Sequence, residues 1–226
     1  MNNNEQKYIS ILKKLVYDKI AVDINEQTIE DVVKNDLYKS HIDDKKSANF
    51  QKFYFKTLNN EELYLIETKF FQQFKQQYSL QGIDNKFLGN LELQKKEILK
   101  LIRDNNLTEL YFGTFKKAEI KHGDGVKEKD LGSFFAKLVH TFRPKECCAL
   151  DNPIKRYFGL TKESFFIAFF IISVEYLHWA TDNKELLEVI REKFKLLDKE
   201  QVIKHDHITD LKLLDLIFWS KANRTN

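Results

Sequence analysis

The residues best suited to chemistry lie within positions 128–160, a stretch that holds both prolines and both cysteines of the chain. Gly132 and Ser133 stand where a helix is predicted to begin. A glycine at such a junction lets another group approach the backbone closely, and the free N–H groups of a first helical turn suit an anion such as a DNA phosphate. Asp151 opens the next predicted helix, with Pro153 in its first turn, so its carboxylate is either a plain helix cap or a group available for chemistry.

The spacing of these residues matches a known motif, in which a hairpin glycine is followed by an alanine four residues later and by an aspartate about twenty residues later. Gly132, Ala136 and Asp151 stand at these positions. Residues 150–156, LDNPIKR, are similar to the leucine-aspartate-glycine-asparagine-valine-lysine-arginine of adenine glycosylases. Over about residues 129–158 the chain therefore resembles the helix-hairpin-helix DNA glycosylase superfamily. The resemblance implies a helical fold with a helix-hairpin-helix-like element.

The resemblance also implies roles for individual residues. Asp151, kept ionised by the helix dipole, would stabilise the cationic sugar and orient or deprotonate the attacking water once a base is flipped out. Gly132 and the amide region of Ser133 would hold a backbone phosphate. Lys155 and Arg156 would add phosphate contacts, and the alternative is that both are simply exposed.

Departures from the family pattern bear on the chemistry. Lys129 and Asp130 stand where the family has a proline and its first hairpin glycine, which argues against a tight hairpin. Phe134 stands at the position of the lysine of bifunctional members, so strand cleavage through a Schiff base is not expected. Lys137, one helical turn further, could take that catalytic position only with a changed geometry. His140 is a candidate for DNA contact at the base pocket on position alone, and a hydrogen-bonded core histidine is the alternative.

Other candidate sites are weaker. Residues 205–210, HDHITD, gather metal-ligand types, but alternating histidines at a helix start do not share a helical face, and neither a metal nor another cofactor is predicted. The sequence has no GxxxxGK[ST] phosphate loop, GxSxG elbow or HExxH zinc helix. Cys147 and Cys148 form neither a disulfide framework nor a zinc spacing, which favours a packing role.

The elements that would hold these residues are helical. Apolar spacing predicts helices over residues 5–20, 28–37, 60–78, 91–104, 133–143, 161–179 and 183–197, with one more starting at 151–153 and a last one that starts at Asp206 or Thr209 and runs through Phe218. Loops are predicted over 43–47, 81–90 and 107–129. Residues 49–57, NFQKFYFKT, fit a strand or a helix, and their interleaved basic and aromatic side chains suit a stacking platform for bases or an edge of the core. The apolar run at 165–174 is too short to cross a bilayer and predicts a central buried helix.

With no long linker or repeat, the 226 residues are predicted to form a single all-α domain, or one with lobes over 1–106 and 107–226. The net charge of +3, with bases and acids interspersed, does not by itself require a nucleic-acid partner. The N-terminus lacks a signal-peptide core, and the cysteine usage predicts a cytoplasmic setting.

The leading hypothesis is a monofunctional DNA glycosylase that serves in repair or in phage defence, with DNA as its partner and without a membrane. The alternatives are a non-catalytic nucleic-acid-binding module and a helical domain that binds another protein.

Overall fold

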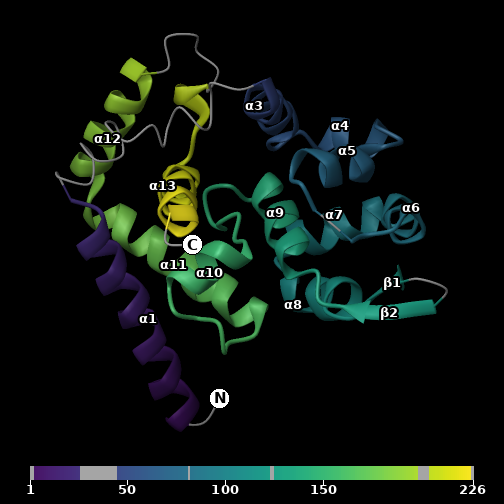
Figure 1. Ribbon diagram of the computed structural model, residues 1–226, viewed down its shortest axis with the longest axis horizontal. Coiled ribbons are helices and arrows are strands. Elements are labelled where there is room, and N and C mark those ends of the chain that lie inside the picture. The colour runs from purple at the N-terminus through teal and green to yellow at the C-terminus, as the bar shows by residue number, and fades with distance from the viewer. Residues whose placement is uncertain (1–2, 26–44, 81, 123–124, 198–203, 225–226) are drawn as a thin grey trace.

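The computed structural model describes residues 3–25, 45–80, 82–122, 125–197 and 204–224, and these form an all-α domain with one small hairpin (Figure 1). The predicted fold class is confirmed. The predicted helix over residues 28–37 lies outside the described residues. The elements, in chain order, are α1 (Asn3–Asp23), α3 (Lys45–Thr57), α4 (Glu61–Ile66), α5 (Phe70–Gln77), α6 (Asn85–Leu93), α7 (Lys95–Arg103), α8 (Leu107–Leu110), a π-helical turn η2 (Tyr111–Phe115), β1 (Ala118–His122), β2 (Gly125–Lys129), α9 (Gly132–Phe142), α10 (Asn152–Tyr157), α11 (Phe165–Asp182), α12 (Lys184–Leu197), a 3-10 turn η3 (His205–His207) and α13 (Asp210–Arg224).

The arrangement of the helices in space does not follow the suggested division at residue 106. Helices α4 to α8 and the hairpin lie to the right in Figure 1, α1 and α11 to α13 lie to the left, and α9 and α10 lie between. Helix α1 packs against α11. The Tyr17 hydroxyl donates to Asp182 at 2.9 Å, and the Tyr157 hydroxyl donates to Asp23 at 2.8 Å. The N-terminal helix therefore belongs with the C-terminal ones.

Helix α11 is the centre of this second group and contacts α1, α9, α12 and α13. Among the helices that the structure describes, it is the one whose length and apolar composition would also suit a membrane span, and 56% of that window is buried inside the protein. Its inner face, including Phe169, Ile172 and Tyr176, is fully buried. Phe170 and Val174 are exposed, so the helix is not buried all round as its composition predicts.

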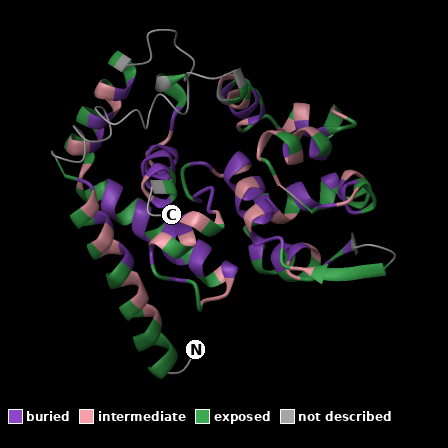
Figure 2. Ribbon diagram, viewed as in Figure 1, coloured by how far each residue is buried: buried purple, intermediate pink, exposed green. Residues whose placement is uncertain are grey.

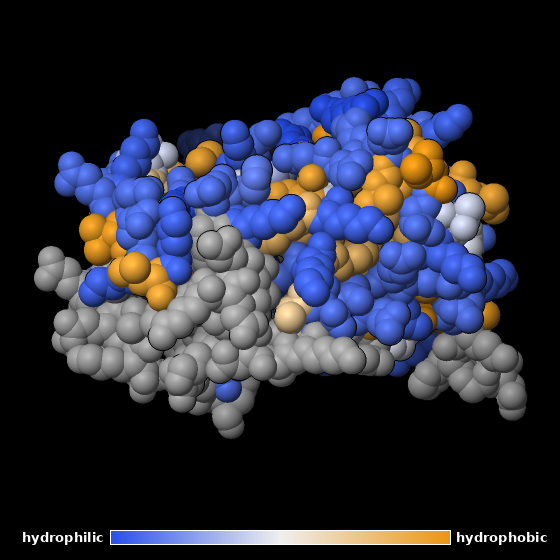
Figure 3. Space-filling model, turned by 90° about the horizontal axis from the view of Figure 1, so that it is seen from above, coloured by the Kyte–Doolittle hydropathy of each residue, from blue (hydrophilic) through white to orange (hydrophobic). Residues whose placement is uncertain are grey.

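The burial of the helices follows their sequence patterns, with inward faces buried and outward faces exposed (Figure 2). Hydrophilic side chains cover most of the described surface seen in Figure 3, and smaller apolar areas lie between them. This surface agrees with the interspersed charges of the sequence, which are typical of solvated helix faces.

Some predicted loops are helical. Residues 85–93 form α6, since the Asp84 side chain accepts from the Phe87 N–H at 2.8 Å and caps the helix. Residues 45–47, predicted as loop, begin α3, and the ambiguous 49–57 segment continues it. The predicted helix over 60–78 is two helices, α4 and α5, because the chain leaves the helical conformation at Glu67.

The segment before α9 differs most from expectation. Where the family resemblance implies a short hairpin between two helices, an antiparallel β-hairpin intervenes, with Ala118 paired to Lys129. The two helical ends are still joined, because the Leu131 N–H donates to the Phe115 carbonyl at 2.9 Å. The structure therefore has helix η2 and helix α9 in contact, with a β-hairpin in place of the tight turn.

Candidate functional site

The connector between α9 and α10, residues 143–151, is held from both sides and fixes the position of the candidate carboxylate. The His140 ring lies 2.7 Å from the Cys147 carbonyl oxygen, which can only accept, so Nδ1 donates. The Ala149 N–H donates to Oδ2 of Asp215 on α13 at 2.6 Å. The connector thus joins α9 to α13 and places its last residue between them.

That last residue, Asp151, is a helix cap that also faces open space. Its Oδ1 accepts from the Ile154 N–H at 3.1 Å, the usual N-cap contact. The same side chain lines two adjoining cavities. The two alternatives that the sequence left open therefore coexist, because capping occupies only part of the hydrogen-bonding capacity of a carboxylate.

The first cavity, of about 420 Å³, is here called the aromatic pocket. Apolar and aromatic side chains supply much of its wall, and a small number of polar groups converge on it, as is usual for ligand sites. It is lined by Lys46, Phe50, Gln51, Gln77, Tyr78, Ser79, Lys137, Ala149, Asp151, Ile154, Lys212, Asp215, Leu216 and Trp219.

The second cavity, of about 520 Å³, is here called the lysine cleft, because Lys116, Lys129, Lys137 and Lys155 line it. Ile83, Ser133, Ser164 and Phe165 are also among its lining residues. Four residues line both cavities, namely Tyr78, Ser79, Lys137 and Asp151. The two catalytic candidates of the sequence, one on α9 and the other before α10, are therefore brought together where the cavities meet.

The floor of the aromatic pocket carries buried charges. Lys212 and Asp215 of α13 are only 6% and 3% exposed. The Lys212 ammonium lies 4.8 Å from the centre of the Tyr54 ring and 5.6 Å from that of Phe50, contacts that offset part of its lost hydration. Burial lowers the pKa of Lys212 and of Lys137, and the carboxylate of Asp215 opposes both shifts.

Three residues on the pocket wall carry a buried polar atom that has no hydrogen-bond partner within the described part of the chain. These atoms are Oδ1 of Asp215, Nε2 of Gln51 and the Tyr78 hydroxyl. Burial raises the pKa of Asp215 to about 7, and the Lys212 charge opposes this rise. A buried polar atom without a partner costs stability, so unsatisfied groups on a pocket wall point to a site that a ligand or water completes.

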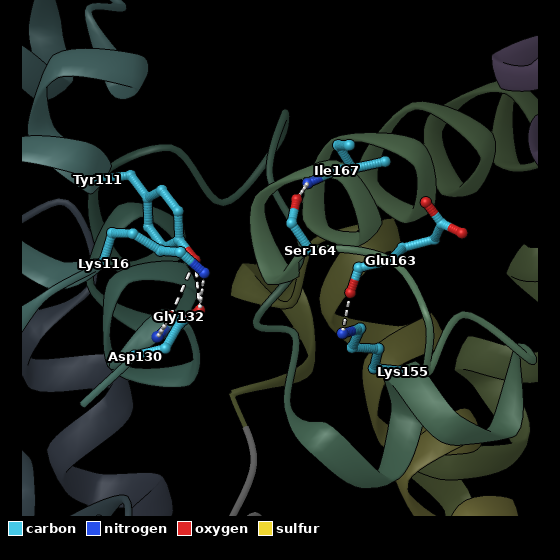
Figure 4. A network of polar contacts seen from close by, with 8 residues as sticks. All are labelled: Tyr111, Lys116, Asp130, Gly132, Lys155, Glu163, Ser164 and Ile167. Carbon is cyan, nitrogen blue, oxygen red and sulfur yellow. Dashed lines mark hydrogen bonds and ion pairs between the residues drawn. The ribbon is translucent and has the colours of Figure 1, made fainter. Parts of the chain in front are cut away.

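Figure 4 shows the two sides of the lysine cleft, with Asp130 on one side and Lys155 on the other. Asp130 accepts from the Tyr111 hydroxyl at 2.9 Å, from Lys116 at 2.7 Å and from the Gly132 N–H at 3.0 Å. The Gly132 N–H, which the sequence predicts to hold a phosphate, is thus bonded to a carboxylate.

The reason for a glycine at position 132 is packing. A Cβ atom there would lie 2.3 Å from the ring of Phe165, far inside van der Waals contact. Ser133, the other residue predicted to hold a phosphate through its amide, lines the lysine cleft, and its Oγ accepts from the Lys137 ammonium at 2.9 Å. The start of α9 is therefore built around α11 and Lys137.

The predicted contacts of His140 with DNA are wrong. The ring is fully buried, with Nδ1 on the Cys147 carbonyl and Nε2 at 2.9 Å from the Tyr54 hydroxyl. Burial lowers the pKa of His140 to about 3. It is a neutral core histidine, the alternative that the sequence left open.

The remaining predicted residues are placed as follows. Lys155 faces the lysine cleft, and its ammonium donates to the Glu163 carbonyl. Arg156 is exposed and lines neither cavity. Cys147 and Cys148 are buried free thiols whose pKa burial raises, in agreement with a packing role.

Sequence reasoning missed three buried polar residues of the aromatic pocket, namely Gln51, Lys212 and Asp215. Lys212 and Asp215 interrupt the apolar run of LKLLDLIF on α13, and two charges inside so apolar a helix are a signal of buried polar function. Gln51 and Phe50 belong to the 49–57 segment, for which a stacking role was one of two interpretations. Trp219 carries no such signal.

Comparison with protein-family profiles, with curated protein sequences and with solved structures finds no match to this chain, so the site is interpreted from its own geometry.

Proposed function

We propose that the protein is a monofunctional DNA glycosylase, which hydrolyses the bond between a base and its deoxyribose. The observation that carries the proposal is the position of Asp151 and Lys137, at the junction of an aromatic pocket large enough for a base and a cleft lined by lysines. Aromatic faces stack on bases, and lysines contact phosphates. The junction is where the sugar of a flipped nucleotide would lie.

In this proposal the two cavities divide the nucleotide between them. The base enters the aromatic pocket, and its phosphates follow Lys116 and Lys155 along the lysine cleft. The bond between C1′ and the base nitrogen breaks, its electron pair leaves with the base, and Asp151 stabilises the positive charge on the sugar. A water oxygen bonds to C1′ and its proton passes to Asp151. The same proton then goes to the nitrogen of the departed base, so that one water is consumed and Asp151 is a carboxylate again.

Lys137 has an electrostatic role in this scheme. Its ammonium donates to the Ser133 hydroxyl, and the Asp151 carboxylate acts against the loss of its charge on burial. A charged amine is no nucleophile, so Lys137 would attract the Asp151 carboxylate and hold a phosphate in place. Phe134, at the position of the lysine of bifunctional glycosylases, packs in the core against Phe115 with ring centres 5.5 Å apart. Both features support hydrolysis rather than Schiff-base chemistry.

One observation favours a second candidate function, a nucleic-acid-binding module without catalysis. Asp151 has a sufficient structural reason to be present, because it caps α10. The cleft and pocket would then bind a nucleotide without cleaving it. Either function, with two free cysteines, agrees with the proposed cytoplasmic location.

The test is abasic-site formation on duplex DNAs that carry ordinary, damaged or phage-modified bases, with the wild type compared with Asp151→Asn. Asparagine can still accept the Ile154 N–H and keep the cap, but it carries no charge. We expect the wild type to form abasic sites and the variant to form at least about 100-fold fewer while it binds DNA equally well. Equal cleavage by both proteins, or none by either folded protein, would reject the enzyme and leave the binding module.

A further inference from the structure

Buried polar atoms of the aromatic pocket that lack a hydrogen-bond partner indicate which ligand groups the pocket can bind. Asp215 presents Oδ1, an acceptor, because its Oδ2 already accepts from the Ala149 N–H. Gln51 presents the N–H groups of Nε2, which are donors. The Lys212 ammonium, also on the pocket wall, can only donate. The buried polar side chains of the pocket wall therefore supply one acceptor and two donors.

The wall around these groups suits a flat ligand. The rings of Phe50 and Tyr78 lie edge to face, with centres 5.1 Å apart, and Trp219 is 39% exposed at the same pocket. The volume of about 420 Å³ is enough for a purine. A planar ring system with donors on one edge and acceptors on another would satisfy all three polar groups.

Among the bases of DNA, guanine offers this pattern. Its N1–H and 2-amino group are neighbouring donors for a carboxylate, and its O6 and N7 are acceptors for an ammonium and an amide. Adenine has no neighbouring pair of donors. The pyrimidines present a single ring N–H or none, and they fill less of the pocket.

We propose that the aromatic pocket selects a guanine-type base, with Asp215 reading the N1–H and 2-amino edge and with Lys212 and Gln51 reading O6 and N7. Guanine-type here means guanine and its oxidised or alkylated forms that keep this edge. The inference names the substrate class of the proposed glycosylase and rests on that function for its biological meaning. The binding itself requires no catalysis.

The experiment measures binding of 2′-deoxyguanosine, 2′-deoxyadenosine and 2′-deoxycytidine through tryptophan fluorescence. The chain has two tryptophans, and Trp179 is only 2% exposed in α11 whereas Trp219 lies at the pocket. We expect deoxyguanosine to quench the fluorescence at least about 10-fold more tightly than the other two nucleosides. Trp219→Phe should lose the quenching and identify its source.

Asp215→Asn is the decisive variant. Its side-chain oxygen must stay on the Ala149 N–H, so an amide nitrogen replaces Oδ1 and turns the acceptor into a donor. We expect the preference for deoxyguanosine over deoxyadenosine to fall at least about 10-fold, since paired base contacts carry much of the discrimination between bases. Gln51→Glu, which replaces the amide donor by an acceptor, should weaken deoxyguanosine in the same way.

Three results would overturn the proposal: no quenching by any nucleoside up to about 10 mM, equal affinity for the three, or an unchanged preference in Asp215→Asn. These results are separable from the abasic-site assay. Selective binding without excision would keep the pocket and reject the enzyme, and excision of another base would keep the enzyme and reject the inference.

Discussion

Lys137 on α9 and Asp151, directly before α10, line the same two cavities. Burial lowers the pKa of the amine, and the carboxylate acts in the opposite direction. The carboxylate therefore supports the charge of the amine at the point where we place the sugar of the nucleotide.

We expect Lys137→Gln to reduce excision by about 10- to 100-fold, because the site loses a cation where the two cavities meet and the substrate loses a phosphate contact. Lys155→Gln is the matched control, because Lys155 lines the lysine cleft but not the aromatic pocket. This variant should weaken binding to all duplexes alike and reduce the slope of log K against log salt by about 1. Single-turnover rates and salt titrations check both. Equal excision rates and equal salt slopes in the two variants would contradict a role of Lys137 in catalysis.

His140 and Asp215 are two separate buried titratable side chains, and they predict opposite pH dependences of the stability. His140 has a pKa near 3 in the folded protein and near 6.5 when unfolded, so the unfolded state binds the extra proton and stability falls as the pH drops through this range. Asp215 has a pKa near 7 when folded and 3.8 when unfolded, so the folded state holds the extra proton and stability falls as the pH rises from about 4 to 7.

The two effects should largely cancel between about pH 4 and pH 6.5, and single variants should expose each one. In urea unfolding, Asp215→Asn should lose stability toward acid with a slope approaching about 1.4 kcal/mol per pH unit. His140→Asn, whose amide can still donate to the Cys147 carbonyl, should instead gain stability toward acid. If the free energy of unfolding changed with pH in the same way in both variants, these groups would not titrate as their burial requires.

Two glycines in helices predict effects of opposite sign. Gly132→Ala should destabilise the protein by roughly 1–3 kcal/mol, because the new methyl group would overlap the Phe165 ring. Gly89→Ala, in α6, meets nothing within 4 Å and should stabilise the protein by up to about 1 kcal/mol through helix propensity. Thermal and urea unfolding measure both changes. If Gly132→Ala left the free energy of unfolding unchanged, the first residue of α11 would have to move aside at little cost.

The cap of α10 separates the structural from the chemical role of Asp151. Asp151→Ala removes the acceptor of the Ile154 N–H and should cost about 1 kcal/mol, whereas Asp151→Asn should lie within a few tenths of the wild type. Denaturant unfolding distinguishes them. If both variants excise no base, the difference in their stabilities shows that the lost activity does not follow from the lost cap.

Sequence reasoning could predict the helical class and several helix starts, because these depend on neighbours in the chain. Asp151 and Thr209 are examples, each capping the helix that follows it. It could also single out Lys137 and Asp151. It could not predict the aromatic pocket, since Gln51 and Asp215 are far apart in the chain and only the fold brings them to one cavity. His140 was misplaced because its partners, Tyr54 and the Cys147 carbonyl, cannot be inferred from helical spacing.

The contact of Gly132 with Phe165 has a consequence for any set of related chains. Selection for stability alone would keep glycine at this position wherever an aromatic ring begins the helix opposite, whether or not the protein ever meets DNA. Conservation of a glycine here would therefore indicate selection for the close packing of two helices. Conservation of Asp215, whose charge burial disfavours, would instead indicate selection for what the pocket binds.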